Sequence, residues 1–201
     1  MTARQSLPLD SRIAGSLTGG PSFSLRNRFV RAAWSPVWLL LAAWTPRHLR
    51  LWRVFLLRVF GARVAWSADV RGSARVWYPP HLIMHDRALI AARVNCYCMA
   101  PITVHQGALI SQGAFLCAGT HDIDDPAFQL LAHPIDIGAH AWIAAEAFIG
   151  PGVTIGQGAV AGARAVVTRD IAPMAIAVGN PARVLKRQRK TVADKFDQNE
   201  G

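Results

Sequence analysis

Apolar side chains recur every six residues through the larger, C-terminal part of the chain. The recurring positions are Val64, Val70, Val76, Met84, Ile90, Cys96, Val104, Ile110, Leu116, Ile137, Ile143, Ile149, Ile155, Ala161 and Val167. Four residues after each stands a second small or apolar residue, which is alanine in ten of the fifteen cases. Each of these second residues stands two positions before the next hexad residue, except across an insertion. Residues two apart on a strand face the same side, so both kinds of position face one interior. A six-residue period of this kind predicts a parallel β-helix of hexapeptides.

The interruptions of this period all follow a third hexad. Steps of eight residues precede Met84 and Val104, and a step of 21 residues precedes Ile137. If three hexads make one coil, every insertion leaves the same corner of a triangular prism. Five coils then run from Val64 to about Ile171. The axis of such a prism is narrow, and the alanines follow because two large side chains in one place would overpack it.

A different composition marks residues 26–63. This stretch contains four tryptophans, eight arginines and no acidic residue. Pro36 and Pro46 interrupt its apolar pattern, which predicts two short amphipathic helices. Two interpretations are open at this point. A basic helix with tryptophan on it can lie in a membrane interface, or the helices pack on the main domain and leave their arginines in water.

Four segments are therefore expected along the chain. Residues 1–25 form a flexible leader and residues 26–63 form the helical segment. Residues 64–185 form the β-helix domain, with the insertion at 122–136. Residues 186–201 form a basic tail, where we expect a short C-terminal helix to close the last coil, because the end of a solenoid needs a cap.

The charge balance narrows the choice of partners. Lysine and arginine number 22 against 12 acidic residues, for a net charge of +10. Such a field favours polyanions, but no recognised nucleic-acid-binding motif accompanies it, so we expect no nucleic acid partner. Three cysteines are too few for a secreted disulfide framework, which favours a reducing cytoplasm. No secretory signal is recognisable, and the longest apolar stretch is shorter than the roughly 20 residues of a membrane span.

Three motifs carry a resemblance to a known family. They are "GTHD" at 119–122, "VTRDI" at 167–171 and "GNPAR" at 179–183. With the hexads, they make residues 45–190 resemble the hexapeptide-repeat O-acetyltransferases, nearest to the colanic acid biosynthesis acetyltransferases, with galactoside and maltose acetyltransferases as cousins. The resemblance implies a left-handed β-helix, a homotrimer and transfer of an acetyl group from acetyl-CoA. The implied acceptor is a sugar hydroxyl in exopolysaccharide or other glycan biosynthesis, held on a lipid at the inner membrane face or free.

The resemblance also assigns a catalytic residue. His121 occupies the place of the family's catalytic histidine, where imidazole would remove the proton of the attacking hydroxyl. Asp122 follows it and either orients it, binds the acceptor or serves as a turn residue. Asn95 is a candidate contact to the acceptor, although the sequence around it departs from the family pattern. His81 takes the equivalent corner two coils earlier, but no family motif surrounds it.

Coenzyme A needs small residues along a groove and cations near its phosphates. By the same resemblance, the cofactor-binding positions are Trp142, Ala145, Ala163, Thr168, Arg169, Arg183 and Lys186. Arg169 and Lys186 stand where the family has a lysine and an arginine, which keeps the charge but alters the contact geometry. No metal is expected.

Other functions remain as alternatives. One is O-acetylation of a soluble sugar or a xenobiotic. Another is a hydratase like the γ-carbonic anhydrases, but no two histidines have the five-residue spacing of its metal ligands. The third is a non-catalytic hexapeptide protein.

Overall fold

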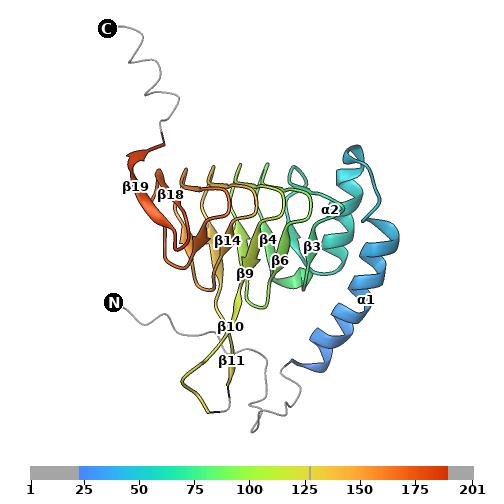
Figure 1. The fold of residues 1–201 in the computed structure, drawn as a ribbon. Coiled ribbons are helices and arrows are strands. Elements are labelled where there is room, and N and C mark those ends of the chain that lie inside the picture. The colour runs from blue at the N-terminus through green and yellow to red at the C-terminus, as the bar shows by residue number, and fades with distance from the viewer. Residues whose placement is uncertain (1–22, 127, 190–201) are drawn as a thin grey trace, which may run out of the picture.

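The repeat folds into a three-sided parallel solenoid with two helices at one end (Figure 1). The computed structural model describes residues 23–126 and 128–189. The chain begins with α1 (Leu25–Leu41), the short helix η1 (Arg47–Leu49) and α2 (Arg50–Val59). Most of the expected leader, and the expected tail beyond residue 189, lie outside the described residues.

Three stacks of strands form the faces of the prism, and their strands run parallel except for the last one of the second face. The first face contains β1 (Arg63–Val64), β4 (Leu82–Met84), β7 (Ile102–Val104), β12 (Ile135–Ile137) and β15 (Thr154–Ile155). The second contains β2 (Asp69–Val70), β5 (Leu89–Ile90), β8 (Leu109–Ile110), β13 (Trp142–Ile143), β16 (Val160–Ala161), β18 (Ala175–Val178) and β19 (Arg183–Gln188). The third contains β3 (Arg75–Val76), β6 (Asn95–Tyr97), β9 (Phe115–Cys117), β14 (Phe148–Ile149) and β17 (Val166–Val167).

The register of these stacks confirms the five predicted coils, and the structure adds a further one. Val64 pairs with Met84, and Ile149 pairs with Val167, so residues of equivalent hexads lie above one another. A sixth coil begins with a single bridge from Ile155 to Ile171 and continues into β18. The predicted hexad positions are buried, as strand alternation requires.

One part of the interior differs from the alanine pattern. The places two residues before Met84, Val104 and Ile137 hold Leu82, Ile102 and Ile135 instead, each fully buried. Each of them follows an insertion. Counting four residues forward from the last hexad position before the insertion therefore identifies a residue that is not two before the next strand position. These three strands of the first face therefore contribute paired large side chains, whereas alanine fills the equivalent places on the other two faces, except for Val94.

We call the corners first, second and third in the order in which the chain passes them within a coil. The third corner joins the third face to the first, and all three insertions leave there, as predicted. The first of them contains the short helix η2 (Pro79–His81). The longest carries a hairpin of β10 (Gly119–His121) and β11 (Leu130–Ala132), which projects from the body of the solenoid (Figure 1).

The helical end completes the hydrogen bonds of the first coil. Within the solenoid, the N–H groups of one coil donate to carbonyls of the next, as Arg71 donates to Ile90 at 3.0 Å. The corresponding carbonyls of the first coil have no coil before them. Trp34 donates its indole N–H to the carbonyl of Val76 at 2.7 Å, and Trp38 donates to that of Ala74 at 3.1 Å. Both tryptophans are buried.

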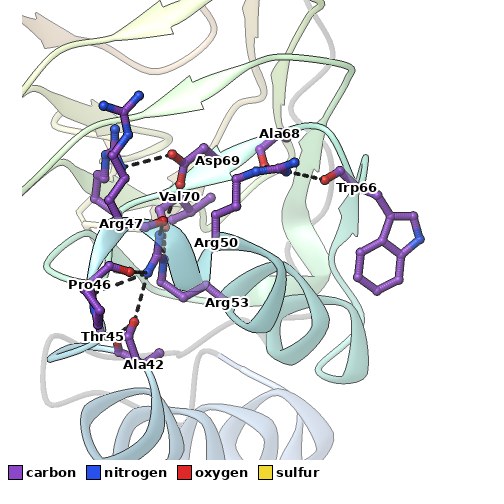
Figure 2. A network of polar contacts seen from close by, with 11 residues as sticks. Ala42, Thr45, Pro46, Arg47, Arg50, Arg53, Trp66, Ala68, Asp69 and Val70 are labelled. Atoms are coloured by element: carbon purple, nitrogen blue, oxygen red, sulfur yellow. Dashed lines mark hydrogen bonds and ion pairs between the residues drawn. The ribbon is translucent and has the colours of Figure 1, made fainter.

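Arginines of α2 cap the same carbonyl edge (Figure 2). Arg53 is fully buried, and its Nε donates to the carbonyl of Val70 at 2.6 Å. Arg58 donates to the carbonyl of Val64 at 2.6 Å. Arginine and tryptophan side chains are donors only, so they suit an edge of acceptors. The packing interpretation of residues 26–63 is therefore right for these side chains, although Arg53 is not in water as that interpretation had it.

The opposite end of the solenoid corrects the expectation of a closing helix. Residues 183–188 form β19, which pairs antiparallel with β18 through Val178 and Arg183. The outer edge of β18 presents unpaired backbone groups, and a strand satisfies them in a way that a helix cannot. Gly179, with φ of +93°, and the Pro181 that follows reverse the chain so that this pairing forms. Across the described ranges, no helix combines the length and apolar character needed to cross a bilayer.

Candidate active site

His121 lies on the projecting hairpin with an exposed imidazole. Its Nδ1 lies 2.9 Å from the carbonyl oxygen of Phe128, and the two rings stack at 4.4 Å between centroids. A carbonyl oxygen only accepts, so in the neutral imidazole Nδ1 carries the proton and Nε2 keeps its lone pair. This is the tautomer that a general base needs, with its second nitrogen oriented by the protein.

Asp122 makes local contacts within the same hairpin. Its carboxylate accepts a hydrogen bond from the N–H of Asp124 at 3.1 Å, and its own N–H donates to the carbonyl of Gln129 at 2.8 Å. The turn interpretation of Asp122 therefore fits the structure. The partner that orients His121 is the carbonyl of Phe128, and a backbone group leaves no signal in the sequence.

A pocket of about 560 Å³ lies between α1 and the third face. Asn95 lines it, together with Trp77, Tyr97 and Arg31. The guanidinium of Arg31 stands 4.2 Å from the centre of the Trp77 ring. Burial raises the pKa of the Tyr97 phenol above its ordinary value, so this side chain is a neutral donor near pH 7. Aromatic walls with a few polar groups are typical of a small-molecule site.

The pocket meets the hairpin of β10 and β11 at Tyr97, and we call this hairpin the arm. A Cβ on Gly119, the first residue of β10, would lie 3.2 Å from the Tyr97 ring. His121 is two residues further along the same strand. The sequence analysis missed Trp77 and Tyr97, although each directly follows a hexad residue at equivalent places of two successive coils, which was a usable signal.

Ala145 and Ala163 lie at the second corner, on successive coils. The N–H of Arg164 donates to the carbonyl of Ala145 at 2.9 Å, which confirms that the two alanines stack along one edge. Trp142 precedes this corner on β13, with 42% of its surface exposed. Its indole donates to the hydroxyl of Ser111 at 2.9 Å, which holds the ring against the second face.

Thr168, Arg169 and Arg183 line one cleft of about 290 Å³ at the end of the solenoid. They come together because residues 179–182 run beside β17. The N–H of Val166 donates to the carbonyl of Gly179, and the N–H of Ala182 donates to that of Val166. Lys186 is exposed on β19 and does not line this cleft. The cleft presents two cationic side chains to a ligand.

A single chain does not bring all predicted site residues together. The arm of His121 leaves the third corner, whereas Ala145 and Ala163 occupy the second. His81 lies at the third corner with its Nδ1 3.1 Å from the carbonyl oxygen of Cys98. Among residues 23–126 and 128–189, no three histidine, cysteine or acidic side chains are grouped so that they could hold a metal ion.

Comparisons with known proteins give relatives that cover most of the chain. The chain is 39% identical over 158 residues to the Escherichia coli (strain K12) protein named colanic acid biosynthesis acetyltransferase WcaF, covering 79% of this chain and 87% of that protein. No protein-family model matches the chain.

Solved structures share the fold. A hexapeptide-repeat-containing acetyltransferase from Vibrio cholerae has a TM-score of 0.74 and 27% identity, covering 87% of this chain and 98% of the other. Another structure of that enzyme contains acetyl coenzyme A and is 24% identical, with a TM-score of 0.74 over 84% and 91% of the two chains. A galactoside acetyltransferase in complex with coenzyme A shows the same fold at 23% identity, with a TM-score of 0.74 over 83% and 84%. The predicted fold class, a left-handed parallel β-helix, is confirmed.

Proposed function

The chain belongs to the hexapeptide-repeat acetyltransferases, and from this premise we propose that it transfers the acetyl group of acetyl-CoA to a sugar hydroxyl, with His121 as general base. The observation that carries the proposal is the 2.9 Å contact between Nδ1 of His121 and the carbonyl oxygen of Phe128, which requires the proton on Nδ1. The imidazole Nε2 is thereby left as the acceptor for a proton from an incoming hydroxyl.

The reaction is a direct transfer. Nε2 of His121 takes the hydroxyl proton while the oxygen attacks the thioester carbonyl carbon. The carbon–sulfur bond then breaks, and the imidazolium returns the proton to the departing thiolate. The products are the O-acetylated sugar and free coenzyme A. No acyl-enzyme is needed, so no cysteine has to act as nucleophile.

The pocket of Asn95 receives the acceptor. A sugar ring can pack on the faces of Trp77 and Tyr97 while Asn95 and Arg31 bond its hydroxyls. Arg31, like Trp77 and Tyr97, is a pocket residue that was not predicted from the sequence. Asp122 remains a second candidate contact, although its carboxylate already accepts from Asp124. The assignment to exopolysaccharide or other glycan biosynthesis rests on the name of the WcaF relative.

The second corner and the terminal cleft receive acetyl-CoA. The small side chains of Ala145 and Ala163 leave room for the extended arm of the cofactor beside Trp142. Arg169 and Arg183 then face its phosphates, with Thr168 in the same cleft and Lys186 on the adjoining β19. The acceptor pocket lies at coils one and two, the arm leaves coil three, and this groove follows at coils four to six. Donor, base and acceptor are thus in order along the axis.

A homotrimer completes the site. In one chain the arm leaves the third corner, whereas Ala145 and Ala163 lie at the second. His121 can therefore reach these alanines only when the arm of one copy lies along the second corner of its neighbour. Three copies around an axis repeat this contact three times and leave no arm unused. Light scattering should therefore give a trimer, and a fully active monomer at micromolar concentration would contradict this arrangement. We place the enzyme in the cytoplasm, where acetyl-CoA is available.

The test is the replacement His121→Ala, with His81→Ala as the control at the equivalent corner. A general base contributes about 100- to 10,000-fold to rate, so kcat of His121→Ala should fall by that range. Turnover is measured as free thiol released from acetyl-CoA with a panel of glycosyl acceptors. Coenzyme A affinity, measured by calorimetry, should change little in either variant, and His81→Ala should keep its turnover. A fully active His121→Ala enzyme would refute the assignment.

A further inference from the structure

Large apolar side chains cover the outer side of the helical end. Between 39% and 70% of their surface is exposed, and no residue within 23–126 or 128–189 covers them. We define the end surface by six of them: Leu40, Trp44, Trp52, Phe55, Val59 and Trp66. The helices lie at the end of the solenoid opposite β18 and β19 (Figure 1). Exposed apolar side chains that gather in this way mark an interaction site.

The members of the end surface are in contact with one another. Trp52, Phe55 and Val59 follow one face of α2 by helical spacing, and the rings of Trp52 and Phe55 stack at 5.7 Å. The indole of Trp52 donates to the carbonyl of Leu41 at 2.8 Å, which ties α2 to the end of α1. Phe55, Val59 and Trp66 line one open groove. The surface is thus continuous across both helices.

Capping of the first coil does not account for these residues. The side chains that cap its carbonyls, such as Trp34 and Arg53, lie on the inner side of the helices and are buried. Trp44, in contrast, is 70% exposed, and its indole donates only to the carbonyl of Leu40. The outer side therefore carries aromatic and aliphatic residues that the packing of this chain does not need.

The charges of the helical segment itself have one sign. Arg47, Arg58 and Arg63 are exposed beside it, and the chain has no acidic residue between Asp10 and Asp69. A second protein would have to match both the apolar surface and an unrelieved positive rim. A bilayer of anionic phospholipids offers both, because tryptophan rings prefer the headgroup region and arginines meet the phosphates.

We propose that the end surface docks on an anionic phospholipid bilayer, with α2 and the end of α1 lying in the plane of the membrane. The apolar side chains enter the boundary between headgroups and acyl chains, and the arginines remain at the phosphates. The long axis of the solenoid then points away from the membrane.

Docking would bring the acceptor pocket close to the bilayer. Leu39 lines the pocket of Asn95, and its neighbour Leu40 belongs to the end surface. A sugar carried on a membrane lipid would therefore meet the pocket from the membrane side. This consequence rests on the proposed acetyl transfer, whereas the docking itself does not.

The experiment is co-sedimentation of the full chain with vesicles of phosphatidylglycerol and phosphatidylcholine, compared with phosphatidylcholine alone. Binding should require the anionic lipid and should weaken as salt is raised, since each arginine at the surface contributes about a fivefold factor. The triple variant Leu40→Ser, Phe55→Ser and Val59→Ser should bind at least tenfold more weakly. Leu185→Ser, an exposed apolar residue at the other end of the solenoid, should bind like the wild type.

Two further measurements make the outcome decisive. The variant Arg47→Gln with Arg63→Gln leaves the packing intact and should lose about 25-fold in binding and part of the salt dependence. Absence of sedimentation with anionic vesicles, or equal binding by the triple variant, would overturn the proposal. It would also be overturned if the triple variant changes the oligomeric state without lipid, because the surface would then join copies of the chain. Vesicle binding does not depend on turnover, so failure here leaves the His121 assignment untouched.

Discussion

Replacing Arg53 tests whether α2 is needed to cap the solenoid. The guanidinium donates to the carbonyl of Val70 at 2.6 Å and to that of Pro46 at 2.8 Å. It also donates to the hydroxyl of Thr45 at 2.9 Å and lies 3.3 Å from the carboxylate of Asp69. Arg53→Met keeps most of the volume and removes every donor, so all of these contacts are lost together (Figure 2).

The loss of folding free energy depends on whether each former partner of Arg53 can find another hydrogen-bond donor. The carbonyl of Val70 lies beneath α2, where losing its donor costs about 1–3 kcal/mol. Pro46 is exposed, so water can replace the donor there and the cost is small. Asp69 keeps a second partner, Arg71, at 3.1 Å, so no carboxylate is left unpaired. We therefore expect a loss of about 3 kcal/mol, below the upper end for breaking a buried ion pair.

The assay is urea denaturation at one fixed protein concentration, followed by circular dichroism. Concentration must be fixed because assembly adds to apparent stability. Arg53→Lys should fall between wild type and Arg53→Met, since one ammonium cannot reach partners on both sides. Arg63→Met, at an exposed arginine, should change stability by less than about 0.5 kcal/mol. A loss below about 1 kcal/mol for Arg53→Met would refute the view that the carbonyl edge needs this cap.

The remaining predictions concern the cofactor, the contact of the helical segment with the first coil, and the thiols. Arg183→Ala should raise the Kd of coenzyme A about tenfold in calorimetry, because a charged hydrogen bond contributes about 1.5–3 kcal/mol when intact. It should lower kcat much less than His121→Ala does. Gly72→Ala should destabilise the fold by about 1–3 kcal/mol, since its Cβ would lie 2.6 and 2.7 Å from two carbonyl oxygens just after α1. Gly150→Ala, with a nearest contact of 3.2 Å, should cost less in the same denaturation assay. Burial raises the pKa of the Cys117 thiol, so its labelling by iodoacetamide at pH 8 should be slower in the folded protein than in urea, as followed by mass spectrometry.

The candidate site was predictable where the family motifs are local. His121, Thr168, Arg169 and Arg183 belong to continuous motifs, and the structure gathers the last three in one cleft. Trp77 and Arg31 were not predicted, because they meet only when α1 packs beside the first coil. The carbonyl that orients His121 could not be predicted either. Every residue has a carbonyl, and only the folded hairpin determines which one lies near the imidazole.

The six-residue period by itself determined the solenoid, its first five coils and the corner from which the insertions leave. This succeeded because the direction of a side chain on a strand depends only on its place within the hexad. Only the tertiary structure determined which groups the arginines and tryptophans of residues 26–63 contact. Trp34 and Arg53 face inward because their acceptors, the carbonyls of Val76 and Val70, lie on an edge that exists only once the first coil has formed. It likewise decided that residues 183–188 form a strand, because the free edge of β18 is a product of the completed stack.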